Sequence, residues 1–161
     1  MTTSVLVPMV GDCPHRAAAA EWVQAWYRDR LPSWQVVSGS CPGGPFVKSE
    51  AVADALTQAT GDVLVIADAD VTVEPLASAI AAVEEGAPWV VPHVLVHRLT
   101  EAATAHLYAT GERVGDLEKG CPYVGTVGGG MTVMRRDVYE DCPLDGRYTG
   151  WGREDEAFGL A

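Results

Sequence analysis

The stretch Val63-Leu64-Val65-Ile66-Ala67-Asp68-Ala69-Asp70 decides the fold class, because a run of apolar residues leads directly into two carboxylates. Such a continuous apolar run is typical of a strand buried on both faces of a sheet. Further apolar runs alternate along the chain with segments of helical spacing. The predicted strands cover residues 5–7, 34–37, 63–66, 89–91 and 131–134, and the predicted helices cover about 14–31, 48–60, 75–85, 100–108, 136–141 and a last stretch after 153.

Strands that alternate with helices predict a three-layer α/β/α, Rossmann-like fold with a mostly parallel central sheet. Right-handed crossovers place the loops after the parallel strands along one edge of the sheet, where ligands of open α/β sheets bind. In the first helix, Ala19, Trp22, Val23 and Trp26 are expected to form the apolar face. Gly61 is expected to end the helix that begins near Lys48.

Composition limits the function classes. The 161 residues favour one domain. The net charge of −11, from 22 acidic and 11 basic residues, argues against binding to duplex nucleic acid. An anionic ligand would need a cation to approach such a surface. The chain has no stretch of about 20 apolar residues and no signal-peptide pattern, so a cytoplasmic protein without a membrane span is expected.

Cysteine and histidine residues carry no standard metal-binding spacing. Each of the four cysteines precedes a proline, and no Cys-x-x-Cys pair occurs, so structural thiols are favoured over a zinc site. His93 and His97 are interpreted as ordinary, partly exposed histidines.

The pair Asp68 and Asp70 is the first candidate site. If strand alternation continues, both side chains point the same way, with the small Ala69 between them. Two convergent carboxylates at a strand end suit Mg²⁺ or Mn²⁺, whose remaining ligands can be diphosphate oxygens and water. The alternative is a solvated, helix-capping turn.

The segment Gly150-Trp151-Gly152-Arg153-Glu154-Asp155-Glu156 is the second candidate site. A carboxylate at the start of this helix can act as a general base towards a hydroxyl, and Trp151 offers a flat face for a sugar ring. Favourable interaction with the helix dipole would explain the acidic residues, but it does not explain Gly-Trp-Gly.

With Gly128-Gly129-Gly130 between them, these two motifs resemble the ordered motifs of GT-A-fold glycosyltransferases. The resemblance runs from about Val5 to Ala161. It is strongest to the inverting family-two enzymes and to the C-terminal region of the β-1,4-galactosyltransferases, which carry a Gly-Trp-Gly-Gly-Glu-Asp motif. It implies a GT-A fold and transfer of a sugar from a nucleoside diphosphate sugar, with UDP favoured, to an acceptor hydroxyl. The acceptor and the oligomeric state are left open.

On the donor side, the resemblance implies the following roles. Pro8 would begin part of the nucleotide-base pocket, and Lys48 would face the donor. Asp68 would lie near the ribose and the metal, and Asp70 would ligate Mn²⁺ or Mg²⁺. The absent side chains of Gly128-Gly129 would leave room for the donor sugar.

On the acceptor side, the resemblance implies that Trp151 and Glu154 hold the acceptor and that Asp155 is the catalytic base. Arg153 stands where relatives carry the second glycine of Gly-Trp-Gly-Gly, and Ala53 stands where many carry Asn. No His follows the Glu-Asp pair, so the chain is expected to be short at its C-terminus. Within one domain, residues 1–110 would bind the nucleotide sugar and residues 111–161 would bind the acceptor and carry the catalytic groups.

Two other functions fit part of the pattern. A nucleotidyltransferase also combines a Rossmann-like sheet with acidic metal ligands, but the loop from Pro8 lacks the expected glycine cluster. A catalytically weak or inactive module that binds sugar nucleotides would keep the fold without turnover.

Overall fold

A computed structural model describes residues 1–10, 13–41, 43–74, 76–112, 114–125, 127–150 and 153–160. The chain forms two compact units. The first comprises Met1–Pro92 and residues 126–161, and the second comprises His93–Gly125. The expected division into a nucleotide-sugar-binding part, residues 1–110, and an acceptor-binding part, residues 111–161, concerns function and stays a prediction.

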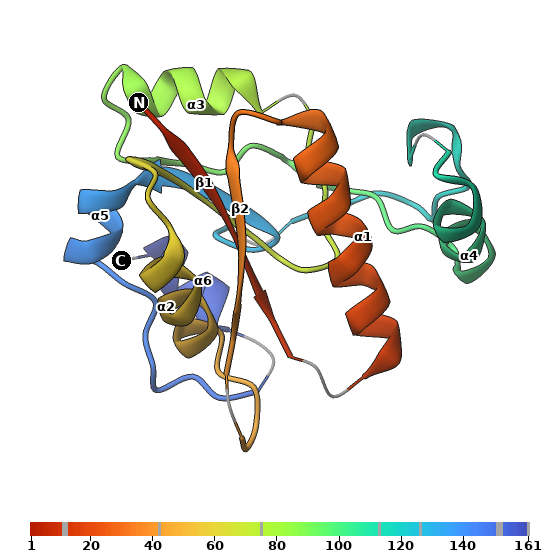
Figure 1. The fold of residues 1–161 in the computed structure, drawn as a ribbon, viewed down its shortest axis with the longest axis horizontal. Helices are drawn as coiled ribbons and strands as arrows, with labels where there is room; N and C mark the ends of the chain where they lie inside the picture. Colours follow the sequence, from red (N-terminus) through yellow and green to blue (C-terminus); the bar gives the residue numbers. More distant parts are fainter. Residues whose placement is uncertain are drawn as a thin grey trace. The chain divides into compact units, whose positions relative to one another are not determined.

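The first unit contains a five-stranded sheet in the order β2-β1-β3-β7-β4 (Figure 1). β1 pairs in parallel with β2 and β3, whereas β7 pairs antiparallel with both β3 and β4. The expected mostly parallel sheet is therefore confirmed, and β7 is its antiparallel member. The strands are β1 (Thr3–Met9), β2 (Gln35–Ser40), β3 (Val63–Ala67), β4 (Trp89–Val90) and β7 (Met131–Arg135).

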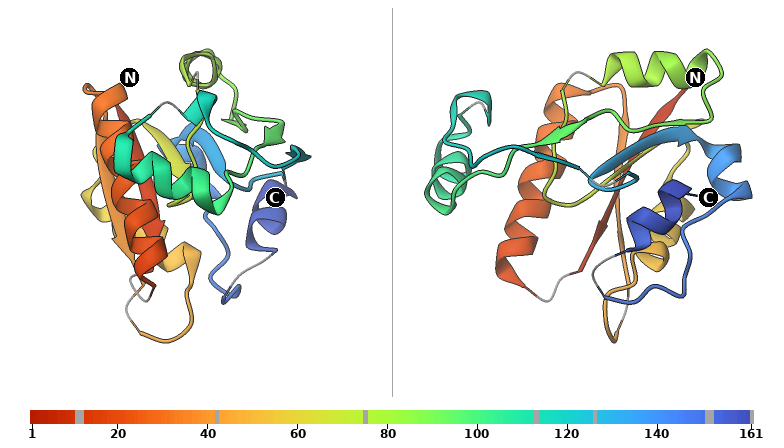
Figure 2. Two further views of the ribbon diagram at one scale, coloured as in Figure 1. Left: turned by 90° about the vertical axis from the view of Figure 1, so that its right-hand side faces the viewer. Right: turned by 180° about the vertical axis from the view of Figure 1, so that it is seen from behind.

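Helices cover both faces of this sheet, which confirms the three-layer arrangement (Figure 2). Alternate strand residues point to opposite faces, so β1 and β3 each contribute to two apolar clusters. One cluster joins the sheet to α1 and α3, and the other joins it to α2, α5 and α6. The helices are α1 (Pro14–Arg30), α2 (Lys48–Gln58), α3 (Ala77–Glu84), α5 (Arg136–Asp141) and α6 (Glu154–Leu160).

The expectation for Gly61 is wrong. Helix α2 ends with Ala59 in an extended conformation at its C-cap, before Gly61 is reached. A Cβ atom on Gly61 would lie 2.5 Å from the backbone nitrogen of Ser4, and the Gly61 N–H donates to Ser4 Oγ at 2.8 Å. Gly61 therefore lets the chain pass close to β1, rather than ending a helix.

The second unit contains α4 (Glu101–Thr110), a short 3₁₀ turn at Val114–Asp116, and a two-stranded antiparallel sheet. Its strands are β5 (Leu95–Val96) and β6 (Tyr123–Val124). Thr100 caps α4, since its hydroxyl accepts a hydrogen bond from the Ala103 N–H at 3.2 Å. In the described ranges, no helix of either unit is both long and apolar enough to cross a membrane.

Candidate functional site

The turn after β3 determines where the two aspartates of the Asp-Ala-Asp motif lie. β3 ends at Ala67, and the Val71 N–H donates to the Asp68 carbonyl at 3.1 Å, which closes a turn over 68–71. Because the strand has already ended, strand alternation does not determine how Asp68 and Asp70 point, and the expected convergence of their side chains stays a prediction. Asp70 is exposed on this turn, whereas Asp68 is partly buried.

Neighbouring elements hold the turn in place. The Asp68 N–H donates to the Gly130 carbonyl at 2.9 Å, because β7 begins beside the end of β3. From the other face, the hydroxyl of Tyr27 on α1 donates to the Val71 carbonyl at 3.0 Å. Burial, together with the nearby Asp68 carboxylate, raises the pKa of Tyr27, so this phenol stays protonated as a donor. Sequence reasoning missed Tyr27, although it lies one helical turn after the core residue Val23.

Lys48 connects the two motifs that the sequence singled out. Its ammonium Nζ lies 2.7 Å from Asp68 Oδ1 and 2.6 Å from Asp155 Oδ1. Its side chain is only 7% exposed. The loop before it is tied to the loop before α6, since the Gly150 N–H donates to the Phe46 carbonyl at 2.6 Å. The contact between Lys48 and Asp155 brings the first turns of α2 and α6 together, and both helices cover the same face of the sheet (Figures 1 and 2).

The start of α6 packs closely on the glycine segment before β7. A Cβ atom on Gly128 would lie 2.5 Å from the Asp155 carbonyl oxygen and 3.2 Å from the Gly159 nitrogen. Gly128 also has φ +83°, which favours glycine. Helix packing therefore accounts for the missing side chain of Gly128, and the room for a donor sugar inferred from the resemblance stays a prediction.

The electrostatics of the site follow from burial and from charge. Burial raises the pKa of the Asp155 carboxyl, and the Lys48 ammonium opposes this only in part. Burial alone would lower the pKa of Lys48, but the carboxylates of Asp68 and Asp155 more than offset it and leave that pKa raised. Lys48 is thus charged at neutral pH, beside a carboxylate more basic than an exposed aspartate.

The remaining predicted residues lie in β1, before β7 and on α6, or outside the described ranges. Pro8 is buried in β1 and pairs with Gly39 of β2. Gly129 is buried before β7, and Glu154 is 8% exposed in the first turn of α6. Trp151 lies outside the residues that the structure describes, so its sugar-binding role stays a prediction.

The donor chemistry of the site suits a divalent cation that arrives with a ligand. Within the described part of the chain, no three or more His, Cys, Asp or Glu side chains gather as a metal-binding group. Carboxylate oxygens such as those of Asp68 and Asp70 are ligands that Mg²⁺ and Mn²⁺ prefer, with diphosphate and water completing the shell. Two carboxylates therefore fit a metal held jointly with a nucleotide better than one held by protein alone.

Comparison with known families identifies the chain. Residues 44–142, more than half of it, match the family described as glycosyl transferase family 2. The chain belongs to glycosyl transferase family 2. The matched part of this family-two protein includes Lys48, Asp68 and Gly128, and it ends before α6.

One solved structure agrees with the fold. The family-two chain is similar to a mutant of the Drosophila β-1,4-galactosyltransferase 7 in complex with manganese, UDP-Gal and xylobiose, with 14% identity and a TM-score of 0.51. The match covers 99% of this chain and 59% of the galactosyltransferase chain. A weaker similarity is to the bifunctional IspDF of Campylobacter jejuni, with 8% identity, a TM-score of 0.46, and coverage of 99% and 47%. No curated protein matches the sequence.

Proposed function

We propose that this family-two protein transfers a sugar from a nucleoside diphosphate sugar to an acceptor hydroxyl, with a divalent metal and with inversion at the anomeric carbon. The observation that carries the proposal is the contact of one buried ammonium, on Lys48, with both Asp68 and Asp155. Three segments far apart in the sequence thus meet at the edge of the sheet where β3 ends. Family membership supports glycosyl transfer as the reaction class.

In this proposal, the donor binds at the end of β3. Asp68 and Asp70 hold Mn²⁺ or Mg²⁺ together with the diphosphate, and the metal supplies charge neutralisation for that group. Lys48 faces the same diphosphate, Pro8 belongs to the base pocket, and Gly128-Gly129 borders the donor sugar. A donor bound through a metal agrees with the net charge of −11, since free nucleotide would be repelled. UDP is the favoured nucleotide, as the sequence resemblance implies.

Asp155 takes the acceptor proton in this proposal. Its raised pKa, caused mainly by burial, makes it a stronger base than an exposed aspartate. Glu154 precedes it on α6, so the two side chains diverge by about 100° and serve different purposes. Glu154 and Trp151 hold the acceptor. A single base facing the leaving diphosphate implies direct displacement, and proton NMR of the product should show an inverted anomeric configuration.

Calorimetric titration of UDP with and without Mn²⁺ tests the donor site. The parent protein should bind UDP in the presence of Mn²⁺ and lose that binding in excess EDTA. Asp70→Ala should lose the Mn²⁺-dependent binding and keep its melting temperature, because Asp70 is exposed. Asp141→Ala is the matched control, since Asp141 is an exposed aspartate on α5. UDP binding that is equal in the parent and in Asp70→Ala would contradict the metal assignment.

Donor hydrolysis separates an enzyme from a module that only binds. A transferase should release UDP from a UDP-sugar slowly without acceptor, and Mn²⁺ should accelerate that release. Metal-dependent donor binding without any release would favour the inactive module. A cytoplasmic location, expected from the sequence, also stays a prediction.

A further inference from the structure

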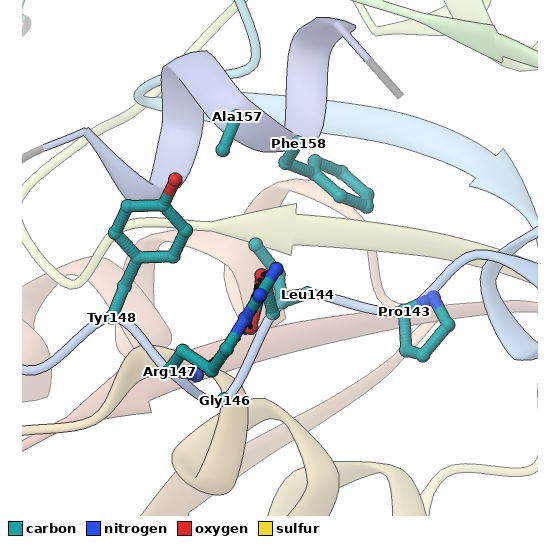
Figure 3. A pocket seen from close by; sticks show the side chains of 8 residues that line it. Pro143, Leu144, Gly146, Arg147, Tyr148, Ala157 and Phe158 are labelled. Carbon is teal, nitrogen blue, oxygen red and sulfur yellow. Dashed lines mark hydrogen bonds and ion pairs between the residues drawn. The ribbon is translucent and has the colours of Figure 1, made fainter.

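A cavity of about 630 Å³ lies between helix α6 and the loop that leads to Gly150 (Figure 3). The loop residues Leu144, Asp145, Arg147 and Tyr148 form one side, and Phe158 of α6 contributes to the other. Its size is within the range of about 300–1,000 Å³ that is usual for small-molecule sites. The roles assigned above to Lys48, Asp68 and Asp155 do not use this cavity.

The walls of the cavity combine aromatic rings with a single charged pair. Figure 3 shows the Tyr148 ring extending from the loop towards α6, with its hydroxyl group on the helix side, and the Phe158 ring reaching down from α6. Phe158 is fixed by ring contacts with Tyr139 and Trp89, with centroids 6.2 and 6.4 Å apart. Tyr148 is only partly buried, and it lines the cavity. Aromatic faces with a polar edge suit the apolar faces and hydroxyls of a sugar ring.

The charged pair makes the cavity neutral. Arg147 donates to both oxygens of Asp145, with Nη2–Oδ2 at 2.6 Å and Nε–Oδ1 at 3.0 Å. The hydrogen bonds from Arg147 lower the pKa of Asp145, so the carboxylate stays ionised and the guanidinium charge is balanced. A balanced pair favours neither an anion nor a cation. It offers acceptor oxygens and donor N–H groups side by side, which suits neighbouring hydroxyl groups.

The cavity is linked to the cluster of Lys48, Asp68 and Asp155 through α6. Phe158 follows Asp155 by three residues, so the two lie on neighbouring positions of one helix surface. The loop that forms the other wall ends at Gly150, whose N–H is bonded to the Phe46 carbonyl two residues before Lys48. A ligand in the cavity would therefore contact the same helix that carries Asp155.

We propose that this cavity binds a neutral sugar unit, stacked on Tyr148 and hydrogen-bonded to Asp145 and Arg147, and that this sugar belongs to the acceptor. Only the last clause rests on the proposed function. Charged sugars are excluded as preferred ligands because the Asp145–Arg147 pair has no net charge to offer them.

Saturation-transfer NMR with methyl β-glucoside, methyl β-galactoside and methyl β-xyloside tests the proposal, with glucuronate as an anionic probe. At least one neutral glycoside should receive saturation from the parent protein. Tyr148→Ala should weaken its binding about tenfold through the lost stacking. Tyr148→Phe should keep most of it, and Arg147→Ala should weaken it without unfolding, because Arg147 is 90% exposed. Tyr123→Ala is the control, as Tyr123 is an exposed tyrosine of the second unit.

The outcomes separate this proposal from the proposed function. Binding of a neutral glycoside that depends on Tyr148 supports the sugar site. No binding by the parent, equal binding by Tyr148→Ala, or stronger binding of glucuronate overturns it. Calorimetry of UDP with Mn²⁺ on the same samples reports the donor site separately. If the parent fails to bind UDP with Mn²⁺ while Tyr148-dependent sugar binding persists, the proposed function fails and the sugar site stands.

Discussion

Replacing Lys48 by methionine should destabilise the first unit by about 3 kcal/mol at neutral pH. Asp68 Oδ1 and Asp155 Oδ1 lie 2.7 and 2.6 Å from Lys48 Nζ, so these two oxygens are at most 5.3 Å apart, the sum of both distances. Without the ammonium, two negative charges at that separation repel each other by roughly 3 kcal/mol at an effective dielectric constant of about 20.

The general scale for breaking a buried ion pair agrees with this value. Removing one partner of such a pair costs about 3–5 kcal/mol. The Asp68 and Asp155 side chains are 28% and 23% exposed. Solvent therefore screens the repulsion between their charges, and the lower end of this range applies to the loss of stability. For a chain of this size, a loss of 3 kcal/mol lowers the melting temperature by about 6–12 °C.

The assay is thermal and urea unfolding of Lys48→Met against Lys119→Met, which replaces the only other lysine of the sequence. Lys119 donates to a backbone carbonyl, that of Gly115, so its removal leaves no carboxylate pair behind. Lys119→Met should melt within about 2 °C of the parent.

The dependence on pH separates charge repulsion from lost packing. Loss of Lys48 removes the group that holds the pKa of Asp155 down, so that pKa rises further above its ordinary value of 3.8. A raised carboxyl pKa gives stability that is present below 3.8 and is lost as the pH rises through the folded value. The stability deficit of Lys48→Met should therefore shrink as the pH is lowered, and adding Asp155→Asn should restore part of the lost stability at neutral pH. A variant as stable as the parent, or a deficit independent of pH, would refute this reasoning.

Three further predictions follow from the same structure. Arg153 has φ +67°, so Arg153→Gly should relieve strain and stabilise the protein by up to about 1 kcal/mol in urea unfolding; a loss of stability would contradict this. A Cβ on Gly39 would lie 1.9 Å from the Ala51 carbonyl oxygen, so Gly39→Ala should give little folded protein by circular dichroism, whereas Gly115→Ala, with open space around it, should fold normally. Asp155→Asn should reduce turnover by at least ~10²-fold with donor affinity nearly unchanged, and the parent's activity should fall on acidification through the raised pKa of Asp155. Near-normal turnover by this variant would assign the base elsewhere.

The sheet was predictable from the sequence because its central strands are buried on both faces. Runs such as Val63–Ala67 contain only apolar residues, and this pattern does not depend on the partner strand. The direction of β7 was not predictable, since pairing depends on where the preceding segment returns to the sheet. β5 and β6 have two residues each, which is too short for any periodic pattern.

The spacing of apolar residues was less reliable for predicting which side chains of a helix are buried. In α1 the buried residues are Ala20, Val23 and Tyr27, whereas Trp22 and Trp26, expected on the apolar face, are only partly buried. Trp22 and Trp26 pack against the core from the edges of the buried helix face, whose centre is formed by Ala20, Val23 and Tyr27. Sequence alone gives no sign that the Tyr27 hydroxyl supports the turn after Asp68.

The sequence pointed to the residues of the candidate site but not to the contacts between them. Asp68 and Asp155 stand in recognisable motifs, and the family resemblance pointed to Lys48. That a single ammonium contacts both carboxylates depends on the first turns of α2 and α6 meeting, and no spacing along the chain encodes this. The turn over 68–71 was likewise not predictable, because the end of a strand is determined by its hydrogen-bonding partners.

The position of the second unit within the chain has a consequence for how such proteins can diversify. The segment His93–Gly125 is inserted between β4 and β7, and these two strands are hydrogen-bonded neighbours in the sheet. The segment therefore leaves the sheet after one strand and returns to the neighbouring strand. Among the residues that the structure describes, none of the strand pairings of the sheet involves a residue of this segment. A shorter, longer or unrelated segment could replace it with no change in strand order. The topology thus allows this segment to change in length without altering the strands and helices that hold Lys48, Asp68 and Asp155 together.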